Sequence, residues 1–322
     1  MDSQIKKLSE LMASKQISCV ELTQKYIDAI ENENNKINAY VNQTPDAAIE
    51  AAKRVDEKIA SGETLLPLEG IPMTLKDNIS TKGIETTCCS NILKGYHPIY
   101  NATVWEILKS QNAVLLGKTN MDEFAMGSSS ETSCFGGALN PHDFSRVAGG
   151  SSGGVASAIG GNLAVYGLGS DTGGSIRQPA SFCGLVGLKP TYGAVSRFGL
   201  IAYASSFDQI GPITTNVEDT ALVYDAISVY DDKDSTCRGR VNEPVCKSLK
   251  NSIKGMKIGI AKEYFDGIRD DVNSAVQNAI KIYESLGAEI VYFDMPSLKY
   301  SLPVYYILAC AEASSNLGRY DG

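Results

Sequence analysis

The sequence predicts an α/β protein with a mixed β-sheet core covered by helices on both faces. Two observations lead to this prediction. Apolar segments of strand length alternate with segments whose apolar residues recur at helical spacing, which is the pattern of layered α/β proteins. The chain has 322 residues, 43% of them hydrophobic and 20% charged, so it can bury a sizeable core in one large domain or in two.

The chain is expected to divide into an N-terminal helical segment, 1–62, and an α/β domain, 63–322. Ser18-Cys-Val-Glu21 fits a capping box, in which the Ser hydroxyl and the Glu side chain satisfy the first free N–H groups of a helix. The elements expected in the first segment are a helix at 3–13, a helix from Ser18 that ends in the acidic, Asn-rich stretch 31–35, a strand at 37–41, and a helix at 46–60 closed by Gly62.

The rest of the chain is expected to continue the alternation. Residues 68–78 are expected to form a turn and then a strand. The other predicted strands are 113–116, 163–167, 185–188, 257–261 and 289–293. The predicted helices are 102–111, 152–158, 217–228 with Asn216 as its cap, 271–286, and a last one from about residue 304. Residues 189–212 are rich in turn formers and are expected to be irregular. Residues 229–252 are polar and leave room for an insertion or an internal boundary.

Composition argues against several classes of protein. The formal net charge is −8 and no basic block is present, so this chain alone is expected to bind nucleic acid poorly. No apolar run reaches the ~18 residues of a membrane span, and the first residues lack the apolar core of a signal peptide, so a cytoplasmic location is expected. The eight cysteines are scattered and are expected to be free thiols. With no C-x-x-C pair and two histidines, a zinc site is not expected.

Two nucleotide-binding motifs are incomplete. Gly117-Lys118-Thr119 resembles the end of a phosphate-binding loop, but position 112 is Asn where that loop needs Gly. Gly167-Leu-Gly169 follows a predicted strand, but position 172 is Thr where a dinucleotide fingerprint needs a third Gly. Neither motif is therefore interpreted as a nucleotide site.

The most distinctive stretches are 148–154 and 173–179. They carry Ser151 and Ser175, each directly after a pair of glycines and 24 positions apart. Glycine lacks Cβ, so it lets backbone N–H groups gather around one point and lets a substrate come close. Such N–H groups beside a hydroxyl are what an acyl-transfer site needs, because they meet the oxyanion as it develops. The alternative is a flexible Gly/Ser linker, against which the apolar segments after both runs argue.

Lys76 is the candidate base. It ends an apolar stretch that begins at Ile71, where a lysine would be partly buried. Desolvation lowers a lysine pKa and makes a neutral amine available. The alternative is a lysine at a strand end that reaches solvent. Asp77 would point to the opposite face of the strand and need not pair with Lys76. A Ser–His–Asp triad would have to use His97 or His142.

These motifs together resemble the amidase signature family. The matching segments are Lys76 after Gly70-Ile-Pro, the glycine run 149–154, and the stretches 169–179 and 184–191. The resemblance implies the mixed α/β fold of that family and a Ser–Ser–Lys triad. Ser175 would be the nucleophile, Ser151, preceded by a cis peptide, would relay the proton, and Lys76 would be the general base and acid. Ser–Lys arrangements serve this purpose because a serine hydroxyl is weak until a base takes its proton.

The same resemblance implies further roles. The family's 24-residue spacing selects Ser151 over its neighbour Ser152. The backbone N–H groups of the glycine loop would form the oxyanion hole, namely those of Thr172, Gly173, Gly174 and Ser175.

Within the family, further stretches resemble the A subunits of tRNA-dependent amidotransferases: 120–130, 192–200, 205–212 and 305–316. Such subunits are glutaminases, in which glutamine acylates the serine, ammonia leaves and the glutamyl ester is hydrolysed. The resemblance implies a B subunit that uses ATP and magnesium to activate glutamate on misacylated tRNA, a small C subunit that clamps A and B together, and no cofactor bound by this chain. Ser128 and Tyr305 or Tyr306 would contact the glutamine.

The chain departs from these A subunits at its end. They continue well past a segment like Arg319–Gly322, and the further part supplies an arginine and an acidic residue that hold the α-carboxylate and α-amine of glutamine. Two other functions therefore stay open. A stand-alone amidase would hydrolyse simple amides without partners, whereas an inactive, truncated scaffold fragment would only bind partners.

Overall fold

The computed structural model describes residues 2–240 and 243–320, so the last two residues of the Arg319–Gly322 segment lie outside the described part. The chain divides into two compact units, one formed by Met1–Cys246 with Ala311–Gly322 and the other by Lys247–Cys310. The first boundary falls inside 229–252, the segment in which the sequence left room for one. The division at residue 62 stays a prediction.

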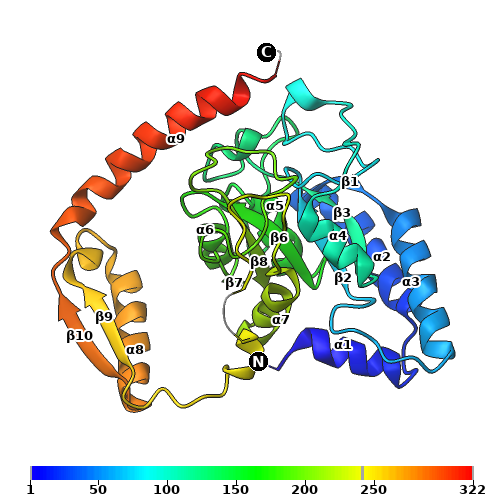
Figure 1. Cartoon of the computed structure of the whole chain (residues 1–322), viewed down its shortest axis with the longest axis horizontal. Helices are drawn as coiled ribbons and strands as arrows, with labels where there is room; N and C mark the ends of the chain where they lie inside the picture. The colour runs from blue at the N-terminus through cyan, green and yellow to red at the C-terminus, as the bar shows by residue number, and fades with distance from the viewer. Residues whose placement is uncertain (1, 241–242, 321–322) are drawn as a thin grey trace. The chain divides into compact units, whose positions relative to one another are not determined.

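The main unit is built on a mixed sheet of six strands in the order β1-β3-β2-β6-β8-β7 (Figure 1). The strands are β1 Tyr40–Gln43, β2 Pro72–Lys76, β3 Val114–Thr119, β6 Tyr166–Asp171, β7 Val186–Gly187 and β8 Gln209–Thr214. β2 runs parallel to β3 and β6, whereas the other pairs are antiparallel. β2, β3, β6 and β8 are buried along their whole length, as expected for inner strands covered by helices. The predicted mixed α/β fold is confirmed.

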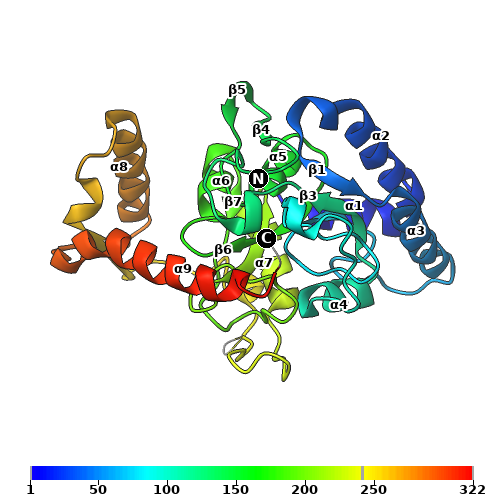
Figure 2. The same ribbon diagram turned by 90° about the horizontal axis from the view of Figure 1, so that it is seen from above.

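The N-terminal helices agree with the sequence patterns that predicted them. They are α1 Gln4–Ala13, α2 Cys19–Ile37 and α3 Pro45–Ala60, and α2 and α3 lie side by side in both views (Figures 1 and 2). The capping box is present, with Ser18 and Glu21 exchanging backbone-to-side-chain hydrogen bonds. Helix α2 does not end at 31–35 as predicted but continues to Ile37, and Asn38 at φ 52° ends it. Strand β1 therefore begins at Tyr40, three residues later than expected.

Four further helices belong to the main unit: α4 Thr103–Ser110, α5 Gly153–Gly160, α6 Arg177–Phe182 and α7 Val217–Ile227. Helix α5 packs against β2, β3, β6 and β8. Asn216 caps α7 as predicted, because its side chain accepts a hydrogen bond from the Asp219 N–H at 2.8 Å. A short hairpin joins β4 Leu139–Asn140 to β5 Asp143–Val147.

Short 3-10 helices occur in both units of the described chain. They are Asn91–Leu93, Glu123–Ala125, Val245–Lys247, Lys262–Phe265 and Pro296–Tyr300.

Two predictions in the middle of the chain are wrong in an informative way. Strand β6 was expected at 163–167 but runs to Asp171, so Ser170 and Asp171, which precede the glycine loop of Ser175, belong to the sheet. The end of the stretch expected to be irregular, 189–212, contains the start of β8, which pairs with β6. Gly211 and Pro212 hid this strand because both disfavour strands in general. Here Gly211 is required, since a Cβ would lie 2.1 Å from the Leu188 carbonyl oxygen.

The second unit is a β-α-β element, as predicted. Strands β9 Lys257–Ala261 and β10 Glu289–Phe293 pair in parallel, and α8 Asp270–Ser285 connects them. Helix α9, Ser301–Leu317, begins in this unit and ends in the main one. Among the described helices, none is long and apolar enough to cross a membrane.

Candidate active site

Lys76 ends strand β2, and its side chain is fully buried. Since β2 and β6 are parallel neighbours, their carboxyl ends lie together and bring Lys76 close to Ser170. The Lys76 ammonium donates to Ser151 Oγ at 2.6 Å, to Ser170 Oγ at 2.9 Å and to the Ser170 carbonyl at 3.2 Å. These three acceptors match the three protons of an ammonium group. The alternative of a solvent-exposed lysine is wrong.

The surroundings of Lys76 prepare it to act as a base. Burial lowers its pKa to about 8, while the negative charges of Asp122, Asp171 and Asp208 oppose that shift. A lysine with this pKa is partly neutral near neutral pH, and its neutral fraction increases as the pH rises through about 8. A neutral amine 2.6 Å from the Ser151 hydroxyl can accept the proton of that hydroxyl.

Ser151 lies in a tight turn that only glycine can form at the two preceding positions. The Gly150–Ser151 peptide is cis, as predicted, and Gly149 has φ +88°. A Cβ on Gly150 would lie 2.0 Å from Asp122 Oδ2, and one on Gly149 would lie 2.4 Å from Gln178 Oε1. The turn is therefore packed against two polar side chains from other segments.

Two hydrogen bonds fix this turn. The Gly150 N–H donates to Gln178 Oε1 at 3.0 Å, and the Ser130 hydroxyl donates to the Gly149 carbonyl at 2.8 Å. Gln178 also donates through Nε2 to the Ser128 carbonyl at 2.8 Å. Gln178 is the second residue of helix α6, which follows Ser175. Its side chain therefore connects the loop of Ser175 to the turn of Ser151 and to the segment of Ser128.

The neighbouring Ser152 has a different position. Its hydroxyl donates to the Ser170 carbonyl at 3.1 Å, and its N–H donates to the Ser175 carbonyl at 3.1 Å. The Ser152 side chain is thus used to hold the end of β6, whereas Ser151 contacts Lys76. This geometry supports the choice of Ser151 as the relay.

Asp171 shapes the loop of Ser175. Its buried carboxylate accepts hydrogen bonds from the N–H groups of Gly174 at 2.8 Å and Ile176 at 3.1 Å, and it pairs with the Arg177 guanidinium at 2.9 and 3.0 Å. Burial alone would raise the pKa of Asp171, but these hydrogen bonds and the charge of Arg177 hold it below the usual range. The carboxylate is therefore a stable anchor around which residues 171–177 fold.

The predicted oxyanion donors are not equivalent in this loop. The Gly174 N–H is engaged by Asp171. Within the part of the chain that the structure describes, the N–H groups of Thr172, Gly173 and Ser175 donate to no other group. These three are available to a bound acyl oxygen. Ser175 itself is 8% exposed.

The predicted substrate contacts fall in both units. Ser128 is exposed and lies beside the turn of Ser151, since its carbonyl accepts the hydrogen bond from Gln178. Tyr305 and Tyr306 lie on α9 in the second unit, with ring centroids 5.4 Å apart and the Tyr306 side chain exposed. Their contact with a substrate stays a prediction.

Sequence reasoning missed several residues of the site. Ser170 and Asp171 immediately precede the nucleophile loop, and a correct boundary for β6 would have indicated them. Asp122 and Asp208 come from distant segments, and no local pattern marks them. Asp77 was expected to need no contact with Lys76; its partners are Thr87 and, at 3.6 Å, Lys118.

Across residues 2–240 and 243–320, no group of three His, Cys, Asp or Glu side chains is placed to hold a metal ion.

A buried amine that contacts a serine hydroxyl, together with a second serine in a loop of available N–H groups, fits a serine-dependent amide hydrolase. The profile of the family named Amidase matches residues 21–322, so this chain belongs to the amidase family.

Particular relatives share most of the chain. It is 56% identical over 318 residues to a protein of Carboxydothermus hydrogenoformans and 54% identical over 320 residues to one of Thermoanaerobacter pseudethanolicus, each named as the A subunit of glutamyl-tRNA(Gln) amidotransferase. These matches cover 98% and 99% of this chain. The chain spans 66% and 65% of the length of those two relatives.

Solved structures of amidases and of an amidotransferase A subunit are also similar to this chain. The A subunit of the same amidotransferase from Thermotoga maritima is 39% identical, with a TM-score of 0.83, and the match covers 98% of this chain and 68% of that one. The native peptide amidase of Stenotrophomonas maltophilia is 31% identical, with a TM-score of 0.89, and the match covers 99% of this chain and 67% of that one.

Proposed function

We propose that this chain is the glutaminase subunit of a tRNA-dependent amidotransferase, the glutamine-hydrolysing glutaminyl-tRNA synthase, which converts Glu-tRNA(Gln) to Gln-tRNA(Gln). The observation that carries the hydrolytic part is the 2.6 Å contact of fully buried Lys76 with Ser151. The choice of glutamine as amide donor rests on the relatives named as A subunits of glutamyl-tRNA(Gln) amidotransferase, which match nearly the whole of this chain.

The first half of the reaction forms an ester. The Ser175 hydroxyl attacks the carboxamide carbon of glutamine, while its proton passes to Ser151 and the Ser151 proton passes to neutral Lys76. The carbonyl oxygen becomes an oxyanion that accepts hydrogen bonds from the free N–H groups of the loop, those of Thr172, Gly173 and Ser175. Lys76, now charged, returns a proton through Ser151 to the amide nitrogen, the C–N bond breaks, and ammonia leaves.

The second half releases glutamate. Water attacks the glutamyl ester and gives a proton along the same path to Lys76. The Ser175 oxygen recovers a proton as the ester bond breaks. Lys76 therefore acts twice as base and twice as acid, which requires a pKa near the working pH.

The remaining parts of the proposal concern the complex. The ammonia would serve a B subunit that consumes ATP and magnesium on Glu-tRNA(Gln), with a C subunit completing a cytoplasmic heterotrimer, and this chain would bind no cofactor of its own. Ser128 and Tyr305 or Tyr306 would contact the glutamine. The helical segment 1–62 would be distinct from the amidase domain 63–322.

A stand-alone amidase is the second candidate. The likeness to a peptide amidase at 31% identity favours it, because that match is as extensive as the match to the structure from Thermotoga maritima.

The experiment is intact-mass analysis of the purified chain after exposure to glutamine, with and without B and C subunits. A glutamyl adduct that is lost in Ser175→Ala supports the proposed chemistry. Hydrolysis of simple amides at the same rate with and without partners would favour the stand-alone amidase. A folded chain that forms no adduct and turns over no amide under any of these conditions would contradict both enzymatic functions.

A further inference from the structure

Asp208 connects two loops beside the candidate active site. The side chain is only 3% exposed. Its Oδ1 accepts a hydrogen bond from the Thr172 hydroxyl at 2.6 Å, and its Oδ2 accepts the N–H groups of Tyr203 at 2.8 Å and Ala204 at 3.0 Å. One carboxylate therefore ties the first residue of the glycine loop to the segment 203–206.

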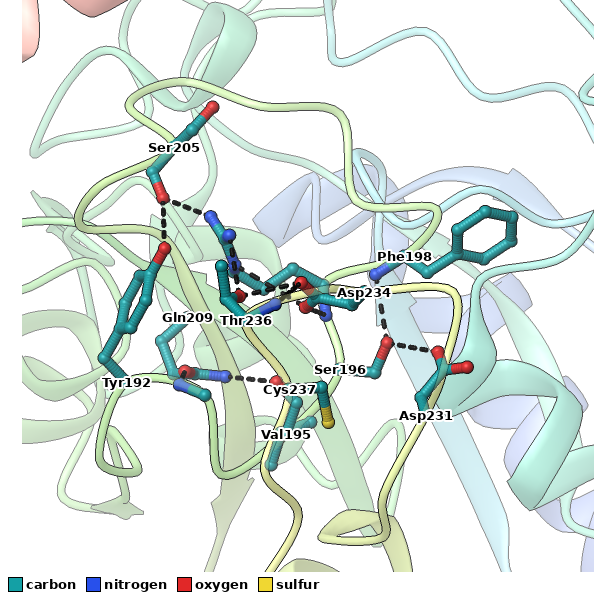
Figure 3. A network of polar contacts seen from close by, with 12 residues as sticks. Tyr192, Val195, Ser196, Phe198, Ser205, Gln209, Asp231, Asp234, Thr236 and Cys237 are labelled. Carbon is teal, nitrogen blue, oxygen red and sulfur yellow. Dashed lines mark hydrogen bonds and ion pairs between the residues drawn. The ribbon is translucent and has the colours of Figure 1, made fainter.

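The segment 203–206 is itself fixed by side chains from the main unit. The Ser205 carbonyl accepts hydrogen bonds from the Tyr192 hydroxyl at 3.0 Å and from the Arg197 guanidinium (Figure 3). The Arg197 guanidinium also lies over the Tyr192 ring, 4.7 Å from its centroid. Asp208 thus connects Thr172 to the segment 203–206, which other side chains hold in place.

The end of helix α9 holds the same segment from another direction. Glu312 accepts the Ser206 N–H at 2.9 Å, and Asn316 donates to the Tyr203 carbonyl at 3.1 Å and to Ser205 Oγ at 3.2 Å. The segment 203–206 therefore contacts the turn of Tyr192 and Arg197, helix α9 and, through Asp208, the glycine loop.

We propose that Asp208 is a positioning residue of this active site, which holds the Thr172 end of the glycine loop so that the N–H groups of Thr172, Gly173 and Ser175 face the acyl oxygen. The inference rests on the proposed Ser175 chemistry. Thr172 has one of the three N–H groups that are free to donate, and its hydroxyl connects it to Asp208. Without Asp208, nothing from the 203–206 segment would fix the orientation of that N–H group, and oxyanion donors are effective only when they are already in place.

Asp208 also acts on the base. The titratable groups that act on Lys76 are the carboxylates of Asp122, Asp171 and Asp208 and the thiol of Cys88. The three carboxylates raise the pKa of Lys76 against the effect of burial. The pKa of the Cys88 thiol is itself raised by burial, so that thiol stays neutral. Removing the charge of Asp208 therefore lowers the pKa of Lys76 further. The pH at which the rate rises should move down, which a purely structural residue would not cause.

The experiment compares Asp208→Asn with wild type by the rate at which a fluorophosphonate probe labels Ser175, followed by intact mass across pH. In this reaction the Ser175 oxygen forms a bond to phosphorus, fluoride leaves, and the hydroxyl proton passes to the base. Labelling should slow by roughly 10- to 100-fold, less than the loss caused by deleting an oxyanion donor. The rising limb of the pH profile should shift to lower pH. Where glutamine is turned over, kcat should fall more than KM rises.

Asp231→Asn is the matched control. Asp231 is 7% exposed and also accepts hydroxyl hydrogen bonds. One comes from Ser196 at 2.5 Å (Figure 3), and the other comes from Thr103 at 2.5 Å. Asp231 is not among the groups that shift the pKa of Lys76. It should label like wild type. Thr172→Val is a second test that leaves the carboxylate in place: it should lose rate without the downward pH shift, and Thr172→Ser should recover most of that rate.

The outcomes separate the two proposals. If wild type is labelled at Ser175 but does not hydrolyse glutamine, the substrate assignment fails while the role of Asp208 is still measured. Equal labelling rates and pH profiles for Asp208→Asn and Asp231→Asn would overturn the role of Asp208. If Asp208→Asn does not fold, Thr172→Val decides, and full labelling activity in Thr172→Val would also overturn that role. A folded wild-type chain without any labelling at Ser175 would overturn both.

Discussion

Two fully buried lysines lie on adjacent strands, and they differ in what surrounds them. Lys76 on β2 and Lys118 on β3 are both inaccessible to solvent. Lys118 donates to the Ile79 carbonyl at 2.6 Å and to Thr86 Oγ1 at 2.9 Å, and its ammonium lies 3.6 Å from the buried carboxylate of Asp77. Within residues 2–240 and 243–320, the hydrogen-bond acceptors of Lys76 are uncharged, and one of them is the hydroxyl of Ser151.

The comparison shows that burial alone does not identify a catalytic base. Burial lowers the pKa of Lys118 and raises that of Asp77, and the opposite charge of each partner counteracts both shifts. Lys118 and Asp77 therefore form a structural ion pair, and Lys118 donates hydrogen bonds to Ile79 and Thr86. Among the described residues, Lys76 has no carboxylate as a hydrogen-bond partner. Its contact with Ser151 gives its proton a route to the site.

The largest effect is expected from Lys76→Met. The wild-type rate of Ser175 acylation should rise with pH through about 8, because only the neutral amine accepts a proton. The variant should lose at least about 10³-fold in acylation and show no such rise, since Lys76 is both base and acid. Labelling by the fluorophosphonate probe and glutamine turnover measure this. Recovery of most of the rate at high pH would mean that Lys76 only positions Ser151.

Lys118→Met should affect stability instead of chemistry. It leaves the Asp77 carboxylate buried without its cation, which typically costs about 3–5 kcal/mol in the free energy of unfolding. Urea unfolding of the main unit measures this, and acylation per folded molecule should stay within a few-fold of wild type.

Two further variants test that explanation. Adding Asp77→Asn to Lys118→Met should restore part of the lost stability, because the unpaired charge is gone. Lys53→Met, which removes an exposed lysine next to Glu50, should leave the unfolding midpoint nearly unchanged. A Lys118→Met chain as stable as wild type would show that the pair with Asp77 is dispensable.

The contrast between Lys76 and Lys118 also shows which features of the structure can be predicted from the sequence and which cannot. Elements with local signals were predicted, among them the capping box of Ser18 and the β-α-β element at 257–293. Strand β8 was not, because its Gly211 is needed for a tertiary contact that no local pattern shows. Similarly, Lys76 and Ser151 stand in recognisable motifs. The role of Lys118 depends on Asp77 from another strand, and local sequence does not reveal which of two buried lysines has a charged partner.

The same limit applies to the residues that hold the catalytic groups in place. Asp208 and Asp122 act on Lys76 from distant positions in the chain, so only the fold brings them together. Gln178 was visible within the motif of Ser175, but its contacts with Gly150 and Ser128 required the structure.

The smallest expected effect, from Gln178→Met, tests whether the base function of Lys76 depends on a fixed position of Ser151. Methionine has a similar length but can neither accept from the Gly150 N–H nor donate to the Ser128 carbonyl. Ser151 would then be held less firmly near Lys76, and acylation should slow roughly tenfold, since small misplacements of reacting groups are costly. The pH at which the rate rises should not move, because no charge is lost.

Gln178→Glu and Gln24→Met complete this test. A glutamate at 178 can accept from Gly150, but its carboxylate faces the Ser128 carbonyl without a proton to donate. Its rate relative to wild type should therefore improve as the pH falls and the carboxylate becomes protonated. Gln24 lies exposed on α2 and bonds only Asp28 among the described residues, so Gln24→Met should match wild type. Equal acylation by Gln178→Met and Gln24→Met would show that Ser151 reaches Lys76 without this support, and that the strands alone distinguish the two buried lysines.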